Sequence, residues 1–296
     1  MSTAATASPR VHPDATVHPS AIVEGDVEVG AGTTIGPGCI VLGTVGPVRI
    51  GPKCTLIAHA MVNGPITIGE SNVLYPNVCL GFAPQDLGFD PSAPGPGCVI
   101  GDRNVFREGA TVHRGKTSEP TRIGNKNYWM TNTHLGHDGV VGNNCIFGSG
   151  AVLGGHVLVA DNVILGGLAA LHQFVRVGHH CFISGAAGVT QDLPPWFMAT
   201  AINVAGSINI VGLRRSGATP ATIATVRWVY RMVYRSGATP QQALELLRDR
   251  ADDPLVAEYI EFISSSKRGI CHGAGRATRG TAARATKGEA AIEALG

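Results

Sequence analysis

Apolar residues recur in this chain with a period of six. Counting from Ile123, every sixth residue through Val189 is apolar, although only 44% of the chain is hydrophobic. These residues are Ile123, Trp129, Leu135, Val141, Phe147, Leu153, Val159, Leu165, Leu171, Val177, Ile183 and Val189. Neither an amphipathic helix nor a half-buried strand has this period. It is typical of a parallel β-helix, whose inward side chains stack coil upon coil, so we expect an all-β solenoid of hexapeptide repeats.

The same period runs through the first part of the chain in three registers. Its members are Val11, Val17, Val23, Val29, Ile35 and Val41, then Ile50, Leu56, Val62, Ile68, Leu74 and Leu80, then Ile100, Phe106 and Val112. Each change of register marks an insertion, and the longest lies between Leu80 and Ile100. Long loops on compact folds are often functional. We therefore expect the insertion loop, residues 81–99, to take part in binding.

Two adjacent prolines, Pro194 and Pro195, mark the end of the repeats, because proline cannot donate a hydrogen bond in a sheet. We place the β-helix at residues 11–196, preceded by an N-terminal extension over residues 1–10. A C-terminal α-helical domain is expected over residues 197–265.

Three sequence pairs mark the expected helix starts, because each supplies a capping residue followed by proline at the first helical position. They are Thr219-Pro220, Thr239-Pro240 and Asp253-Pro254. Beyond them, residues 266–296 are basic and rich in Gly, Ala, Arg, Thr and Ser. This composition predicts a disordered tail.

Composition narrows the class of protein. The formal net charge of +2 gives no reason to expect a nucleic-acid partner. The seven cysteines are odd in number and contain no CxxC pair, which argues against a disulfide framework or a zinc ribbon. Four of them, Cys39, Cys54, Cys145 and Cys181, share one small-residue position of the hexad, where we expect buried fillers. No signal core and no apolar run of transmembrane length is present, so we expect a cytoplasmic protein.

Candidate chemistry centres on the histidines. There are eleven, and most have no special context, but His134 and His137 lie three residues apart and Asp138 follows the second. A triangular coil takes about 18 residues, which predicts a column containing His137, Gly155 and Gln173, flanked by His156 and His172. An imidazole can act as a general base, a carboxylate can orient it, and a glycine N–H can stabilise an oxyanion. From spacing alone, catalysis and a structural column both remain open.

Several short motifs resemble, in the same order, those of one family. They are Val17-His18-Pro19-Ser20-Ala21-Ile22-Val23, Gln85-Asp86-Leu87, Ile100-Gly101-Asp102-Arg103-Asn104, Val112-His113-Arg114-Gly115, His134-x-x-His137-Asp138, His172-Gln173-Phe174 and Tyr234-Arg235-Ser236-Gly237. Over roughly residues 11–265, the chain resembles the UDP-N-acetylglucosamine O-acyltransferases that begin lipid A synthesis in Gram-negative bacteria. These motifs are more specific than the hexad, which many acyltransferases share.

The resemblance implies a homotrimer of left-handed β-helices with active sites between subunits. The donor would be a 3-hydroxyacyl chain on acyl carrier protein, and the acceptor the 3-hydroxyl of UDP-N-acetylglucosamine. His137 would be the general base, beside Asp138, and the Gly155 N–H would stabilise the thioester oxyanion. Direct transfer needs neither a metal nor a cofactor beyond the carrier's phosphopantetheine.

The resemblance also assigns residues that would line the substrate site. They are Gln85, Asp86, His134, His156, His172, Gln173, Asn209 and Arg215. Among them, Asp86 would hold the sugar, and Asn209 and Arg215 would face the donor or the nucleotide phosphates. Gly185 occupies the position that measures the acyl chain. Because glycine leaves room, we predict a chain of the myristoyl class over a ten-carbon chain.

Three positions depart from the family pattern. Gly88 stands where a lysine usually follows the loop aspartate by two residues, Val211 where a glutamate is usual, and Ser216 where a second arginine is usual. All three departures concern substrate binding. They are compatible with drift, with an altered acceptor such as another nucleotide sugar, or with a non-catalytic paralogue.

Two other solenoid classes are alternatives. The N-acyltransferases of the same pathway normally carry an extra N-terminal domain, and hexads that begin at Val11 leave no room for one. A γ-class carbonic anhydrase needs three zinc-binding histidines, usually including a pair five residues apart. The close pairs in this chain, His134/His137 and His179/His180, fit that class less well.

Overall fold

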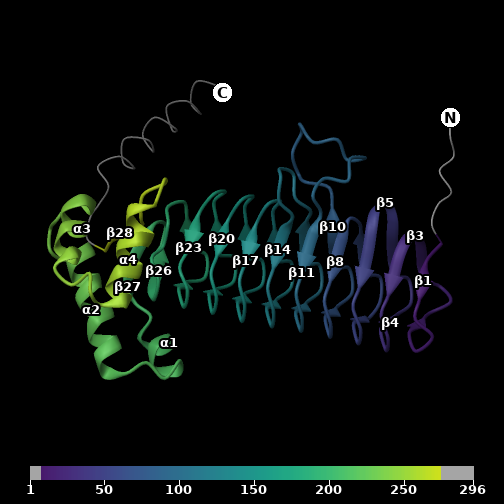
Figure 1. The fold of residues 1–296 in the computed structure, drawn as a ribbon, viewed down its shortest axis with the longest axis horizontal. Coiled ribbons are helices and arrows are strands. Elements are labelled where there is room, and N and C mark those ends of the chain that lie inside the picture. The colour runs from purple at the N-terminus through teal and green to yellow at the C-terminus, as the bar shows by residue number, and fades with distance from the viewer. Residues whose placement is uncertain (1–7, 275–296) are drawn as a thin grey trace, which may run out of the picture.

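The chain coils into a left-handed parallel β-helix, with its axis along the length of Figure 1 and helices at its C-terminal end. This computed structural model describes residues 8–274. Two long strands, β3 (Ile22–Val29) and β5 (Ile40–Ile50), bend around an edge of the prism. The first half of β5 therefore pairs with β7 and its second half with β8, on different faces.

Short strands of successive coils build three faces. The first holds β1 (Arg10–Val11), the second halves of β3 and β5, β8 (Ile66–Ile68), β11 (Cys98–Ile100), β14 (Thr121–Ile123), β17 (Val140–Val141), β20 (Leu158–Val159) and β23 (Arg176–Val177). The second holds the first halves of β3 and β5, β7 (Met61–Asn63), β10 (Cys79–Phe82), β13 (Thr111–His113), β16 (His134–Leu135), β19 (Val152–Leu153), β22 (Ala170–Leu171) and β25 (Gly188–Val189). The third holds β2 (Thr16–Val17), β4 (Thr34–Ile35), β6 (Thr55–Leu56), β9 (Val73–Leu74), β12 (Val105–Phe106), β15 (Tyr128–Trp129), β18 (Ile146–Phe147), β21 (Ile164–Leu165) and β24 (Phe182–Ile183).

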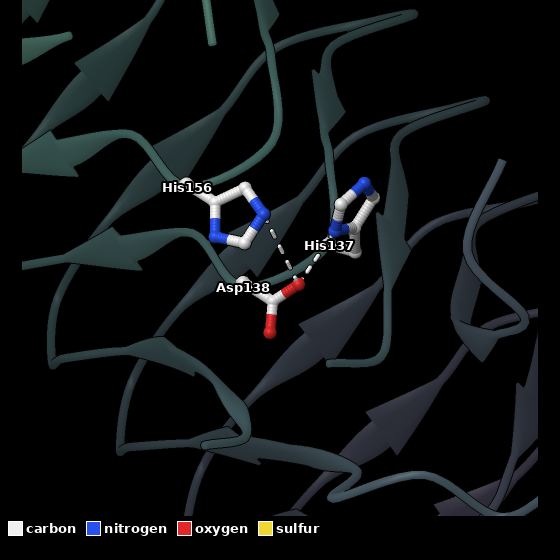
Figure 2. Close-up of side chains that lie close together, drawn as sticks. All are labelled: His137, Asp138 and His156. Carbon is white, nitrogen blue, oxygen red and sulfur yellow. Dashed lines mark hydrogen bonds and ion pairs between the residues drawn. The ribbon is translucent and has the colours of Figure 1, made fainter. Parts of the chain in front are cut away.

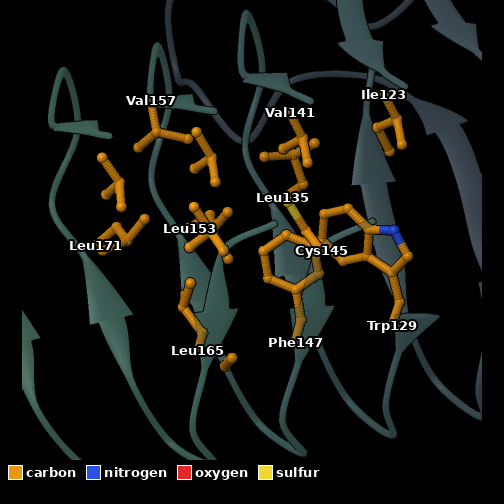
Figure 3. Close-up of a cluster of buried hydrophobic side chains, with 14 of the residues drawn as sticks. Ile123, Trp129, Leu135, Val141, Cys145, Phe147, Leu153, Val157, Leu165 and Leu171 are labelled. Atoms are coloured by element: carbon orange, nitrogen blue, oxygen red, sulfur yellow. The ribbon is translucent and has the colours of Figure 1, made fainter. Parts of the chain in front are cut away.

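The pairing register confirms the predicted 18-residue coil. Leu135 pairs with Leu153, and Leu153 pairs with Leu171. The twelve apolar residues from Ile123 to Val189 are all buried, and they form the central stack drawn in part in Figure 3. Within it, the Trp129 ring stacks on Phe147 with centroids 3.9 Å apart. The six-residue period is therefore the period of the core.

The small-residue position of the hexad is filled as predicted. Cys39, Cys54, Cys145 and Cys181 are all buried in the core, and all seven cysteines are free thiols. The first apolar position behaves differently. Val11, in the first strand of the described residues, is 40% exposed.

The C-terminal part begins with a hairpin that continues the third face. Its strands are β26 (Phe197–Ala201), paired with β24, and β27 (Val204–Ile208). Within the described residues, four helices follow, namely α1 (Ile210–Arg215), α2 (Pro220–Tyr234), α3 (Pro240–Arg248) and α4 (Pro254–Ser264). Thr219, Thr239 and Asp253 cap α2, α3 and α4 as the sequence predicted, each accepting a backbone N–H. The hairpin and α1 were not predicted.

The predicted start of the disordered tail needs correction. Residues 266–274 turn back onto the hairpin, where β28 (His272–Gly273) pairs with β27. Cys271 is buried there, and burial of apolar surface explains why this segment packs. The rest of the predicted tail, residues 275–296, lies outside the described residues. None of the described helices is both long enough and apolar enough to cross a membrane.

Candidate active site

The predicted column of His137, Gly155 and Gln173 lies along one edge of the prism. The His156 N–H donates to the His137 carbonyl at 2.9 Å, and the Phe174 N–H donates to the Gly155 carbonyl at 3.0 Å. These bonds place Gly155 one coil beyond His137, and Gln173 one coil beyond Gly155, as the sequence predicted. We call this the His137 edge. Its left-handed turns fall at Asp138, His156 and Phe174, with φ of 58°, 59° and 66°.

A histidine and an aspartate form the centre of this edge (Figure 2). Nδ1 of His137 lies 2.5 Å from Oδ2 of Asp138, whose side chain is 4% exposed. The carboxylate also accepts the Thr117 hydroxyl at 2.7 Å and the backbone N–H groups of Thr117 and Lys116. Burial raises the pKa of Asp138, but the hydrogen bonds from His137, Thr117 and Lys116 outweigh it and hold the pKa below its usual value. The carboxylate is thus ionised and orients the imidazole.

Gly155 lies directly against the other side of the His137 ring. A Cβ at this position would be 3.0 Å from both Cε1 and Nε2 of His137. Among the described residues, the Gly155 N–H has no hydrogen-bond acceptor. A basic nitrogen and an available backbone donor therefore meet at the same point.

The next histidine on the edge, His156, completes a polar wall. Its Nε2 is 3.7 Å from Asp138 Oδ2, and its ring stacks on Phe174 with centroids 4.5 Å apart. Burial lowers the pKa of His156, and the nearby His137 and Lys116 lower it further against the opposing effect of Asp138. His156 is therefore held in its neutral form.

His134 lies on β16, next to a histidine that sequence analysis did not select. Its Nδ1 is 2.9 Å from the Thr111 hydroxyl, and its ring is 5.2 Å from that of His113. Burial, followed by the proximity of His113, lowers the pKa of His134 to about 4. His113 in turn bonds the Ala83 carbonyl with Nδ1 at 2.5 Å, which ties the insertion loop to this face.

The insertion loop lies between β10 and β11 and projects from the side of the β-helix (Figure 1). Arg114 is fully buried beneath it and donates to the carbonyls of Gly81, Pro91 and Ala93. Within the loop, Asp86 accepts the Gly88 N–H at 2.8 Å and the Lys116 ammonium at 2.7 Å. The hydrogen bond from Lys116 is the main cause that lowers the pKa of Asp86, and His137 also contributes. Asp86 therefore belongs to this site, whereas Gln85 is exposed beside it.

The remaining predicted residues lie farther from the His137–Asp138 pair, and Gln173 is two coils beyond it on the same edge. His172 and Gln173 are exposed on the last coils, where the Arg268 guanidinium reaches His172 Nδ1 at 3.3 Å. Gly185 belongs to a different edge, stacked on Gly167, whose carbonyl accepts the Ala186 N–H. A Cβ at Gly185 would be 3.2 Å from the Gly167 carbonyl oxygen.

The Asn209 side chain, which was expected to face the donor or the nucleotide phosphates, caps α1 in this structure. Oδ1 accepts the Gly212 N–H at 2.9 Å, and Nδ2 donates to the His180 carbonyl at 2.8 Å. The residue is 8% exposed, so both ends of its amide are used inside the chain. Arg215 is exposed at the end of α1, which lies away from the insertion loop in Figure 1. Neither residue joins the His137 site within one chain.

Sequence reasoning missed three residues of the site, His113, Lys116 and Thr117. His113 was available as part of the quoted motif Val112-His113-Arg114-Gly115, and Lys116 follows that motif directly. Their contact with Asp86 and Asp138 depends on how the insertion loop folds. A period of six residues carries no information about that.

His137, Asp138 and His156 are the one group of side chains within residues 8–274 that could hold a metal ion. Two ligands on a tetrahedral zinc ion lie about 3.3 Å apart, given bonds near 2.0 Å. The 2.5 Å separation of His137 Nδ1 and Asp138 Oδ2 is instead that of a hydrogen bond. The set also contains one carboxylate and two imidazoles, not the three histidines expected of a γ-class carbonic anhydrase.

Comparison with known proteins gives concordant matches. Residues 192–271 match the family model described as UDP-N-acetylglucosamine O-acyltransferase, domain 2, and residues 8–43 and 120–155 match bacterial transferase hexapeptide repeats. The solved UDP-N-acetylglucosamine acyltransferase of Francisella novicida is 35% identical, with 90% of this chain and 95% of that chain covered and a TM-score of 0.77. The enzymes of Moraxella catarrhalis and Arabidopsis are 33% and 31% identical, with 88% of this chain and 99% of each covered, at TM-scores of 0.76 and 0.77.

Proposed function

This chain belongs to the UDP-N-acetylglucosamine O-acyltransferase family, and we propose that it transfers a 3-hydroxyacyl chain from acyl carrier protein to the 3-hydroxyl of UDP-N-acetylglucosamine, the first step of lipid A biosynthesis. The observation that carries the proposal is the His137–Asp138 pair with Gly155 against its ring. Because Asp138 is ionised, it accepts a hydrogen bond from the Nδ1–H of His137. Nε2 is then free to act as the base.

The proposed chemistry follows from these three residues. Nε2 of His137 removes the proton of the acceptor hydroxyl as its oxygen attacks the thioester carbon, and a C–O bond forms. The Gly155 N–H stabilises the resulting oxyanion, a contribution of about 10²–10³-fold for such donors. Collapse breaks the C–S bond, and the imidazolium returns its proton to the leaving thiolate. A base so placed contributes about 10²–10⁴-fold.

The surface of α2 supports an acidic carrier protein as donor. Arg227, Arg231 and Arg235 lie on one side of this helix, four residues apart, and all three are exposed. With Tyr230 and Ile208 they line a cavity of about 530 Å³. A basic rim around a partly apolar pocket suits an acidic partner that presents an acyl chain.

An apolar stripe on the outside of the β-helix supports assembly into a homotrimer. On the first face, Val140 and Leu158 are paired neighbours that are 37% and 45% exposed. Exposed apolar ladders of this kind are typical of association surfaces. Assembly would also allow Arg215 and Gly185 of a neighbouring subunit to complete the site at His137.

The test is a panel of acceptors with the wild-type chain and 3-hydroxymyristoyl-acyl carrier protein. We expect product with UDP-N-acetylglucosamine and at least tenfold less with other UDP-sugars. A faster reaction with another nucleotide sugar would mean that Gly88, Val211 and Ser216 mark an altered acceptor. No product with any acceptor from a folded assembly would contradict the proposed function and favour a non-catalytic paralogue.

A further inference from the structure

Lys116 connects the two carboxylates of the site. Its backbone N–H donates to both Asp138 oxygens at 3.2 Å, and its ammonium donates to Asp86 Oδ2 at 2.7 Å. The first carboxylate holds the His137 ring, and the second belongs to the insertion loop. Lys116 is therefore fixed at one end by the residue that orients the base, and at the other by the loop.

The ammonium group has bonding capacity to spare. Lysine carries three N–H donors, and the bond to Asp86 is the one that the Lys116 ammonium makes among residues 8–274. The Lys116 and Asp86 side chains are 34% and 31% exposed, so a ligand can reach the pair from solvent. The remaining donors can reach a ligand oxygen that enters beside His137.

The positive charge of Lys116 matters for ligand binding because the insertion loop has no cation of its own. The insertion loop, residues 81–99, contains Asp86 and Asp90 but no lysine or arginine. A nucleotide diphosphate sugar carries negative charge and would be repelled by Asp86 alone. Lys116 neutralises this carboxylate from the neighbouring coil and adds a donor.

We propose that Lys116 is a binding and positioning residue for the nucleotide-sugar acceptor, orienting Asp86 and donating its free N–H groups to the ligand. It supplies from the next coil the cation that the loop lacks at Gly88. This inference rests on the proposed function, since it takes the ligand of the site to be a UDP-sugar. The proposed role of Lys116 is in substrate binding, because His137 remains the base and Gly155 remains the oxyanion donor.

Gly88 allows a direct test of whether the lysine at position 116 replaces the one that the family usually has at position 88. Its N–H already bonds Asp86, its φ is not in the left-handed region, and a Cβ would meet just the Asp86 Oδ1 atom, at 3.3 Å. A lysine at position 88 therefore starts beside the same carboxylate. The double variant Gly88→Lys/Lys116→Ala should regain acceptor binding that Lys116→Ala loses.

The experiment measures UDP-N-acetylglucosamine binding by calorimetry, and kcat and KM for acyl transfer, on the full chain. The variants are Lys116→Ala, Lys116→Arg, the double variant, and Lys126→Ala as control. Lys126 is an exposed lysine in a left-handed turn on another edge. We expect Lys116→Ala to weaken binding and raise KM about 10- to 100-fold, as for loss of charge-assisted hydrogen bonds, with kcat changed less than about threefold. Lys116→Arg and the double variant should recover at least threefold, and Lys126→Ala should match the wild type.

Binding by Lys116→Ala within twofold of wild type would overturn the inference. So would a loss of kcat or thermal stability without a change in binding, or a loss that neither Lys116→Arg nor the double variant restores. Should Lys116→Ala fail to fold, Lys116→Gln keeps most of the side chain without its charge and carries the same prediction. Failure of the proposed function is distinguishable, because it would be seen in the wild type as absence of both binding and transfer.

Discussion

At the scale of single residues, the site depends on one ionised carboxylate in a dry position. Asp138 is almost completely buried, yet four donors from His137, Thr117 and Lys116 surround it. Burial alone would favour the neutral acid. The donors reverse that preference, and the resulting carboxylate selects the His137 tautomer with a free Nε2.

The Asp138→Asn variant tests this dependence. An amide cannot hold the Nδ1 proton of His137 as a carboxylate does, so the base loses its orientation and tautomer. We expect kcat to fall about 10²–10⁴-fold with KM for the acceptor nearly unchanged. Steady-state kinetics would decide, with Asp14→Asn, an exposed aspartate near the N-terminus, as control. An equal loss of thermal stability and activity would indicate a structural role instead.

His134 gives a prediction for stability against pH. Its pKa is lowered to about 4 in the folded chain, whereas an unfolded histidine titrates near 6.5. Between these values the unfolded chain binds more protons, so the free energy of unfolding decreases as pH falls, by up to about 1.4 kcal/mol per pH unit for this group. His134→Gln should reduce the slope between pH 6.5 and 4, measured by denaturant unfolding. The exposed His59 provides the control His59→Gln, and an unchanged slope in His134→Gln would contradict the account.

Some contacts between single residues could be predicted from the sequence, and others could not. The 18-residue coil correctly placed Gly155 against His137, because that contact follows from the repeat alone. The contact of Lys116 with Asp86 could not be predicted, because it joins a loop of irregular geometry to a neighbouring coil. The capping role of Asn209 was likewise not predicted, although asparagine is a common residue at helix starts.

At the scale of elements, the insertion loop is held in place beside the candidate site. The buried Arg114 bonds three of its carbonyls, and His113 bonds a fourth. These bonds hold Asp86 over the His137 edge, where Lys116 meets it. The loop thus forms one side of the candidate site and is held there by these hydrogen bonds.

Replacing Arg114 should make the insertion loop more mobile. Arg114→Ala leaves the carbonyls of Gly81, Pro91 and Ala93 without their charged donor, and we expect a loss of about 2–4 kcal/mol of local stability. Hydrogen exchange over residues 83–97 should accelerate, and KM for the acceptor should rise. Arg122→Ala, on the adjacent β14, removes a half-exposed arginine and should leave both unchanged. Unaltered exchange in Arg114→Ala would show that the loop is held by other contacts.

The helices show why some elements were predictable and others were not. α2, α3 and α4 begin at capping residues followed by proline, which is a local signal. α1 has one turn and a half and no proline, and the β26–β27 hairpin lacks the period of six. β28 depends on the tail folding back over the hairpin, a tertiary contact that composition does not reveal.

At the scale of the whole molecule, the predicted site residues divide between separate regions. His137, Asp138, Gly155, His156 and Asp86 meet on one edge, whereas Gly185 lies on another and Arg215 at the C-terminal end. A single chain therefore carries an incomplete set. Assembly about the exposed apolar stripe would join the two parts.

Gly185→Met tests both the acyl-chain position and its assembly. A bulky side chain at Gly185 should shorten the groove, so that the preference for a fourteen-carbon over a ten-carbon donor falls at least about tenfold. The readout is transfer from a panel of 3-hydroxyacyl-acyl carrier proteins, with the trimeric mass verified by light scattering. An unchanged preference in an intact trimer would remove Gly185 from the groove, as would a wild type that already favours ten carbons.

The most direct test of the central claim is acyl transfer from 3-hydroxymyristoyl-acyl carrier protein to UDP-N-acetylglucosamine by the wild type and by His137→Ala. His59→Ala, which removes an exposed imidazole on a distant coil, serves as the matched control. We predict robust product from the wild type and the control, and a loss of at least about 10²-fold in His137→Ala. Transfer by a folded His137→Ala variant at the wild-type rate would contradict the assignment of His137 as the base.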